Sequence, residues 1–221
     1  MSEKRNFICL AGIDGSGKST VAEHLIKTTD LHFHYIWARW EPFLLAPFIM
    51  FLNKRTKGTS AKLDEDTQHN KKQRLKNKLL RFSFIKNLWL ILAEYDYFLQ
   101  LLKKILLPYL LHRNIICDRY IYDFYVDQMI NLREDASLLN KYISKRILRV
   151  FPKPDLLLYI TISAKTGNAR KKDGTSVPYL AQRKTFYDQL PNIYTTIEIN
   201  GETELQMVLK TATKALKKYL K

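Results

Sequence analysis

A short stretch near the N-terminus has the residue types and spacing of a phosphate-binding loop. Residues 12–19 fit the pattern G-x-x-x-x-G-K-S/T, in which glycines let successive backbone N–H groups point at phosphate oxygens. We expect Lys18 to reach the β- and γ-phosphates of ATP, and the Ser19 hydroxyl to ligate Mg²⁺. The predicted ATP-binding residues are Gly12, Ile13, Asp14, Gly15, Ser16, Gly17, Lys18, Ser19 and Thr20.

The residues on either side of this loop indicate a strand before it and a helix after it. The apolar run 7–11 is typical of a strand that is buried on both faces of a parallel sheet. Apolar residues from Val21 to Ile26 then follow at helical spacing. In open α/β sheets, ligands bind beyond the carboxyl ends of the strands. Charged residues that follow the other strands should therefore converge on Lys18.

Two further predicted strands end in charged residues. The strand 115–117 leads into Asp118 and Arg119, and the strand 33–37 leads to Arg39. We predict that Asp118 holds a Mg²⁺-bound water and that both arginines clamp phosphates. The alternative for Asp118 and Arg119 is a surface ion pair. The alternative for Arg39 is that it lies in solvent at the end of the strand.

A Lys- and Gly-containing loop follows Arg170 and is interpreted as a lid. We predict that residues 170–177 close over the transferring phosphates, with Arg170 as a cation at the reaction. A plain solvated loop is the alternative.

Strand and helix patterns alternate along the rest of the chain. Further strands are predicted at 156–162 and 195–199, and helices at 122–132, at 137–150, from Pro178 and at the C-terminus. Apolar residues spaced by three and four from Ile85 to Leu106 predict a long core-facing helix that Pro108 kinks or ends. This alternation predicts one α/β domain with a parallel sheet over residues 1–221.

The chain carries a large positive charge that is unevenly distributed. Its 37 Lys and Arg residues against 21 Asp and Glu residues give a net charge of +16, which points to an anionic partner. Residues 53–86 contribute +8 of it and residues 205–221 contribute +5. The longest uncharged apolar stretch, 43–53, is too short to span a bilayer, so no membrane partner is expected. Only two cysteines, Cys9 and Cys117, occur, and both lie in apolar runs, which favours buried thiols and a cytoplasmic location.

Several of these segments resemble thymidylate kinases. Residues 7–20, FICLAGIDGSGKST, are similar to the opening of that family, and Cys117-Asp-Arg-Tyr with Gln128 is similar to its third strand end. Residues 154–162 with Gly167 and Arg170, and residues 196–200, resemble its last two strands and lid entry. The resemblance implies a P-loop NTPase fold with a five-stranded parallel sheet flanked by helices. It also implies a homodimer that moves the γ-phosphoryl group of Mg-ATP onto a nucleoside monophosphate, dTMP in that family.

The resemblance also implies site residues. Asp14 and Arg39 would face the acceptor, and the catalytic residues would be Lys18, Asp14, Arg119 and Arg170. Mg²⁺ would be held by Ser19 and Asp118. The implied acceptor-binding residues are Asp14, Arg39, Glu41, Asp118, Arg119, Tyr120 and Gln128.

The acceptor side leaves two alternatives open. Here Arg39-Trp40-Glu41-Pro42 stands where the family has Arg-Glu-Pro, and no Arg lies between Arg81 and Arg113 to contact an acceptor. A hydroxyl acceptor such as a deoxynucleoside would need a carboxylate base, and Glu41 before Pro42 resembles the Glu-Pro of deoxynucleoside kinases. A nucleic-acid-linked ATPase would use residues 53–86 and the C-terminal stretch as its footprint. Helicase-type ATPases bring further domains, for which 221 residues leave no room, so nucleic acid is not the expected partner.

Overall fold

The computed structural model describes residues 5–47, 50, 82–171 and 175–220. The described residues fall into two compact parts, one within 1–39 and 101–221 and the other within 40–100. Most of the basic segment 53–86, namely residues 53–81, lies outside the described residues. The larger part holds the sheet and the glycine loop.

The larger part is built on a five-stranded, fully parallel sheet. Its strands are β1 (Phe7–Ala11), β2 (Phe33–Trp37), β3 (Asn114–Asp118), β4 (Leu156–Thr161) and β5 (Thr196–Asn200). They lie in the order β2-β3-β1-β4-β5, so β1 is central and pairs with β3 and β4. This arrangement confirms the predicted α/β fold with a parallel sheet, and each predicted strand agrees within two residues at either end.

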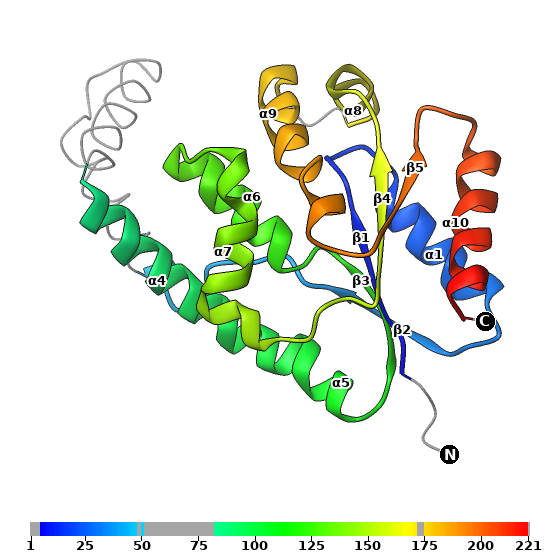
Figure 1. Ribbon diagram of the computed structural model, residues 1–221, viewed down its shortest axis with the longest axis horizontal. Coiled ribbons are helices and arrows are strands. Elements are labelled where there is room, and N and C mark those ends of the chain that lie inside the picture. The colour runs from blue at the N-terminus through cyan, green and yellow to red at the C-terminus, as the bar shows by residue number, and fades with distance from the viewer. Residues whose placement is uncertain (1–4, 48–49, 51–81, 172–174, 221) are drawn as a thin grey trace. The chain divides into compact units, whose positions relative to one another are not determined.

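Helices cover both faces of this sheet (Figure 1). On one face, α1 (Lys18–Thr28) and α10 (Leu205–Leu220) pack their apolar sides against alternate residues of the strands, such as Ile8, Leu10 and Leu158. On the other face lie α6 (Ile121–Leu132) and α9 (Val177–Tyr187), which pack against each other. The central strands are buried on both sides because helices cover both faces, which explains their continuous apolar sequence.

The remaining helices of this part are short. They are α5 (Leu107–Leu110), α7 (Leu139–Lys145) and α8 (Ala164–Arg170), with a π-helical turn at Leu102–Leu106 and 3₁₀ turns at Ala136–Leu138, Ile147–Val150 and Leu190–Asn192. The prediction of one helix over 137–150 was wrong, because the extended backbone of Arg146 separates α7 from the turn that follows it. Pro108 does not end the helix at once, since helical structure continues to Leu110.

The described residues of the smaller part centre on α4 (Ser83–Leu101). The prediction that Leu88, Leu92 and Leu99 face the core was wrong, because they are 45 %, 40 % and 39 % exposed. The buried apolar residues of α4 are instead Leu90, Ala93, Tyr97 and Leu101. This helix is apolar almost all round, so three- and four-residue spacing alone does not identify its buried side.

Two further expectations concern membranes and cysteines. Among the described residues, none of the helices combines the length and the apolar character that crossing a bilayer requires. Cys9 and Cys117 are buried free thiols that face each other in register on β1 and β3, which confirms their predicted burial.

Candidate active site

The glycine loop joins β1 to α1 and is held in a conformation that needs glycine. Gly15 has a φ of 82°, and Gly17, which precedes the first turn of α1, has a φ of 90°. A Cβ atom at Gly12 would lie 2.6 Å from the carbonyl oxygen of Ile160, so only glycine fits there. The backbone N–H groups at the start of α1 have no partner within the helix, which makes this end of the helix suited to phosphate.

Lys18 is buried at the centre of this loop. Its Nζ donates hydrogen bonds of 2.9 Å to the carbonyl oxygens of Gly12 and Ile13, and a longer one of 3.4 Å to Ser16 Oγ. Burial, followed by the nearby charge of Arg119, lowers the pKa of Lys18 to about 8. The ammonium group is therefore held by oxygen acceptors that phosphate oxygens can replace.

Ser19 and Asp118, the two predicted Mg²⁺ residues, are in contact. Ser19 Oγ donates a 2.7 Å hydrogen bond to Asp118 Oδ2, which also accepts a 3.3 Å bond from the Tyr35 hydroxyl. The other carboxylate oxygen, Asp118 Oδ1, is buried without a hydrogen-bond partner. A buried acceptor of this kind fits a water bound to Mg²⁺, which typically keeps several waters and takes few protein ligands. The part of the chain that the structure describes holds no cluster of three His, Cys, Asp or Glu side chains suited to a metal ion.

Asp14 and Arg119 form a buried ion pair beside the loop. The Arg119 guanidinium donates to Asp14 Oδ1 and, over 3.3 Å, to Asp123 Oδ1 on α6. Burial on its own would raise the pKa of Asp14, but Arg119, Arg183 and Lys18 outweigh it and hold this pKa well below its usual range. Asp14 is thus a permanently ionised carboxylate, and the Arg119 side chain is fixed by two acids.

Arg183 on α9, which was not predicted as a site residue from the sequence, extends this charge network. Its side chain is only 1 % exposed, and it donates to Asp127 and, over 2.9 Å, to the Tyr187 hydroxyl. Tyr187 in turn donates to Asp123, the second partner of Arg119. The signal was present in the sequence, because Arg183 lies between Leu180 and Tyr187 on the apolar side of a predicted helix, where a cation needs a buried partner.

The region after β4 touches the loop through a glycine. A Cβ atom at Gly167 on α8 would lie 2.7 Å from the carbonyl oxygen of Asp14, so α8 packs directly on the glycine loop. The Arg170 guanidinium donates a 3.0 Å hydrogen bond to the carbonyl oxygen of Gly201. The next residue, Lys171, approaches the loop, with its Nζ 3.7 Å from Asp14 Oδ2. Residues 172–174 of the predicted lid lie outside the described residues.

The remaining predicted acceptor residues have different surroundings. Arg39 is exposed after β2, next to Ala38, whose N–H donates to the carbonyl oxygen of Asp118. Glu41 belongs to the other compact part, where its carbonyl oxygen accepts a 2.7 Å hydrogen bond from Gln100.

Two predicted acceptor residues are buried. The Tyr120 hydroxyl donates to the carbonyl oxygen of Pro152, and its ring packs on Phe7, the first residue of β1, at the opposite end of that strand from the loop. Gln128 is buried on α6, next to Asp127. The structure thus brings Asp14, Lys18, Ser19, Asp118 and Arg119 together, and adds Lys171.

A parallel sheet of this strand order, with a G-x-x-x-x-G-K-S loop between its central strand and a helix, defines a P-loop NTPase fold. Among solved structures, the chain is similar to a deoxyadenosine kinase from M. mycoides with bound dATP, and thus has the fold of a P-loop kinase. The two share 16 % sequence identity and a TM-score of 0.50 over 95 % of this chain and 98 % of the kinase chain. No protein-family model and no curated protein matches the sequence.

Proposed function

We propose that the protein transfers the γ-phosphoryl group of Mg-ATP to a nucleoside monophosphate, with dTMP as the first candidate. The observation that carries the proposal is the glycine loop with its buried Lys18 and the Ser19–Asp118 contact. Phosphoryl transfer requires alignment and neutralisation of charge more than covalent chemistry, and these residues are suited to both.

Each residue of the site has a distinct role in this proposal. Lys18 neutralises the β- and γ-phosphates, and Ser19 with Asp118 holds Mg²⁺ and its water. The metal supplies charge neutralisation when it is bound. Arg119, fixed by its two carboxylate partners, keeps a positive charge beside the loop, and Lys171 adds a second cation next to Asp14.

The state of Asp14 supports a monophosphate acceptor. A hydroxyl acceptor needs a carboxylate that takes up its proton, and the low pKa of Asp14 makes it a weak base. Asp118 already accepts from Ser19 and Tyr35. A phosphate acceptor is already ionised near neutral pH and needs no base. In this role Asp14 accepts a hydrogen bond from the acceptor, and Arg39 binds its phosphate.

A deoxynucleoside is the second candidate acceptor. It is supported by the similar fold of the deoxyadenosine kinase and by Glu41, which stands before Pro42 as a possible base. Under this alternative, the γ-phosphoryl group passes to a sugar hydroxyl while Glu41 takes the proton.

ADP release distinguishes the two candidates. We expect turnover with dTMP and none with thymidine or deoxyadenosine, and we expect the Glu41→Gln variant to keep most of the dTMP activity. Turnover with a nucleoside but not with its monophosphate, lost on Glu41→Gln, would overturn the first candidate in favour of the second. Glu198→Gln, on β5, is the matched control for the loss of one carboxylate.

We also propose that the protein is a homodimer. An exposed apolar stripe on α4 supports this, with Phe84, Leu88, Ile91, Tyr95 and Leu99 following one another at steps of three and four residues. This spacing suits side-by-side packing of two helices, and an exposed stripe without charged residues is costly to leave in water.

A further inference from the structure

The C-terminal helix α10 carries positive charge that the proposed kinase site does not use. Its apolar side, which includes Val208, Ala212 and Leu216, is buried against the sheet. Its opposite side presents four exposed lysines, Lys210, Lys214, Lys217 and Lys218. Within Leu205–Leu220 there is no acidic residue to neutralise them.

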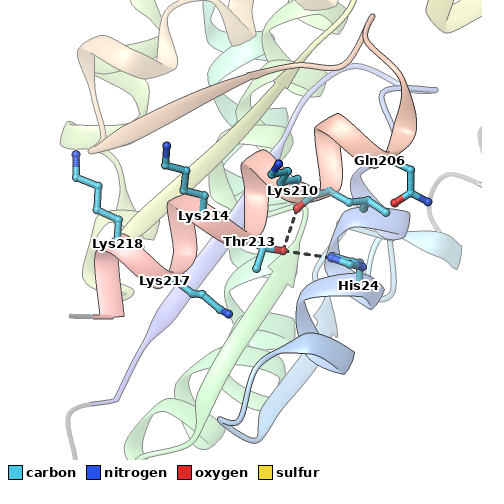
Figure 2. A pocket seen from close by; sticks show the side chains of 8 residues that line it. His24, Gln206, Lys210, Thr213, Lys214, Lys217 and Lys218 are labelled. Carbon is cyan, nitrogen blue, oxygen red and sulfur yellow. Dashed lines mark hydrogen bonds between the residues drawn. The ribbon is translucent and has the colours of Figure 1, made fainter.

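These lysines line an open groove between α10 and α1 with a volume of about 680 Å³. Figure 2 shows the lysines spread along α10, with Gln206 at one end and His24 reaching from α1 toward Thr213. The hydrogen bond between His24 Nε2 and Thr213 Oγ1, 3.2 Å long, joins the two walls. The other lining residue is the apolar Leu209, so the lining combines cationic, neutral polar and apolar groups and includes no carboxylate.

We propose that this groove binds the phosphate backbone of nucleic acid, independently of the kinase reaction. From Lys210 to Lys218, the charges extend over about 12 Å of helix, which matches a line of successive phosphates better than a single anion. Lysines that neutralise phosphates release condensed counterions, and this release supplies most of the affinity.

The lining of the groove indicates the kind of recognition. His24, Gln206 and Thr213 offer hydrogen bonds to phosphate and sugar oxygens. None of the lining residues is Phe, Tyr or Trp, and the His24 ring is hydrogen-bonded to Thr213, so contacts to the phosphate backbone dominate over base stacking in this proposal. Binding should therefore be insensitive to sequence and strongly dependent on salt.

A nucleic-acid strand fits this surface better than an anionic membrane does. Helices that bind at membrane surfaces insert an apolar face among the lipids, but the apolar face of α10 is already buried in the core. The lysines also line a hollow, which a strand can enter and a flat lipid surface cannot. Net charge alone does not indicate where nucleic acid would bind, whereas the groove identifies a specific surface for it.

The test measures binding of a fluorescent single-stranded oligonucleotide of mixed sequence by anisotropy, between about 50 and 200 mM salt. The groove variant changes Lys210, Lys214, Lys217 and Lys218 to Gln. We expect the slope of log affinity against log salt to become shallower by roughly 3, since each lost phosphate contact removes about 0.7. The control variant loses the same charge elsewhere, by changing the exposed Lys141, Lys145, Arg149 and Lys153 to Gln, and should keep the slope.

Three results would overturn the proposal. The first is an equal loss of the salt slope in the groove variant and in the control variant. The second is that the wild-type protein does not bind the oligonucleotide at the lower salt. The third is that binding to phosphatidylserine vesicles depends on the four lysines while binding to the oligonucleotide does not. Thermal melting and ADP release check that the groove variant is folded. If the groove variant does not fold, the single variant Lys214→Gln is used in its place and is expected to reduce the slope by roughly 0.7. If the wild-type protein shows no phosphoryl transfer but still binds the oligonucleotide through the groove, the proposed function is wrong and the groove proposal stands.

Discussion

At the scale of single residues, the state of Lys18 links the fold to nucleotide binding. Its pKa is about 8 in the folded chain, against 10.5 for an exposed lysine, because burial and Arg119 disfavour its charge. Between these two values the unfolded chain binds more protons than the folded one, so Lys18 makes the free energy of unfolding rise with pH in that window. Phosphates placed beside the ammonium group favour its charged form and raise this pKa again.

Nucleotide binding should therefore take up protons. At pH 8 we expect Mg-ATP to bind with uptake of about half a proton, because half of the Lys18 side chains are neutral beforehand. Calorimetric titration in two buffers of different ionisation enthalpy measures this uptake. The Lys18→Met variant should show none. A binding enthalpy of the wild-type protein that is the same in both buffers at pH 8 would contradict this prediction.

Arg183 should matter far more for stability than the lysine next to it. Arg183→Met leaves Asp127 and Tyr187 without their buried partner, so we expect the free energy of unfolding in urea to fall by about 3–5 kcal/mol. Lys184→Met removes an ion pair with Asp188 that is partly exposed, and should cost under about 1 kcal/mol. Equal losses in the two variants would mean that the buried network does not stabilise the fold.

The sequence predicted the residues of the loop well because they depend on local spacing. Ser19 and Asp118 were expected to meet from the rule that strand ends share one edge of the sheet, and they do. The partners of Arg183 could not be predicted in the same way, because Asp127 lies 56 residues earlier and the contact depends on how α6 and α9 pack. Arg119 was expected to face phosphate. Of its two carboxylate partners, Asp123 lies four residues later in the chain, and Asp14 comes from the distant glycine loop.

At the scale of elements, the contact between α8 and the glycine loop should support the conformation of the loop, and a substitution at this contact tests that role. Gly167→Ala places a Cβ atom 2.7 Å from the backbone oxygen of Asp14, so α8 or the loop must shift. We expect a loss of about 1–3 kcal/mol in the free energy of unfolding, with a weaker affinity for Mg-ATP. The control Ala169→Val adds bulk on the exposed side of the same helix and should leave both unchanged. Unchanged nucleotide affinity in Gly167→Ala would show that this contact does not shape the loop.

Strands were more predictable than helices in this chain, for a physical reason. The central strands are continuous apolar runs bounded by polar residues, so their ends are visible in the sequence. In α4 apolar residues lie on every side of the helix, so the sequence does not show which side is buried. Two buried carboxylates, Glu94 and Asp96, lie on its buried side, and Asp96 accepts hydrogen bonds from the backbone N–H groups of Phe43 and Leu44.

At the scale of the whole molecule, the proposed dimer depends on the exposed stripe of α4. Ile91→Arg places a charge in this stripe, and we expect light scattering to change from about twice the chain mass of 26.1 kDa to a single chain. Ile147→Arg, at an exposed apolar residue outside α4, is the matched control and should remain dimeric. A wild-type protein with the mass of one chain would contradict the proposal.

ADP release by Lys18→Ala tests the central claim, which is that the glycine loop binds the phosphates of ATP for transfer. With ATP, Mg²⁺ and the accepted monophosphate, we expect this variant to lose roughly 100-fold or more in turnover. Lys27→Ala, at an exposed lysine on the same helix that forms an ion pair with Glu23, should retain the wild-type rate. Near-normal ADP release by Lys18→Ala would contradict the account.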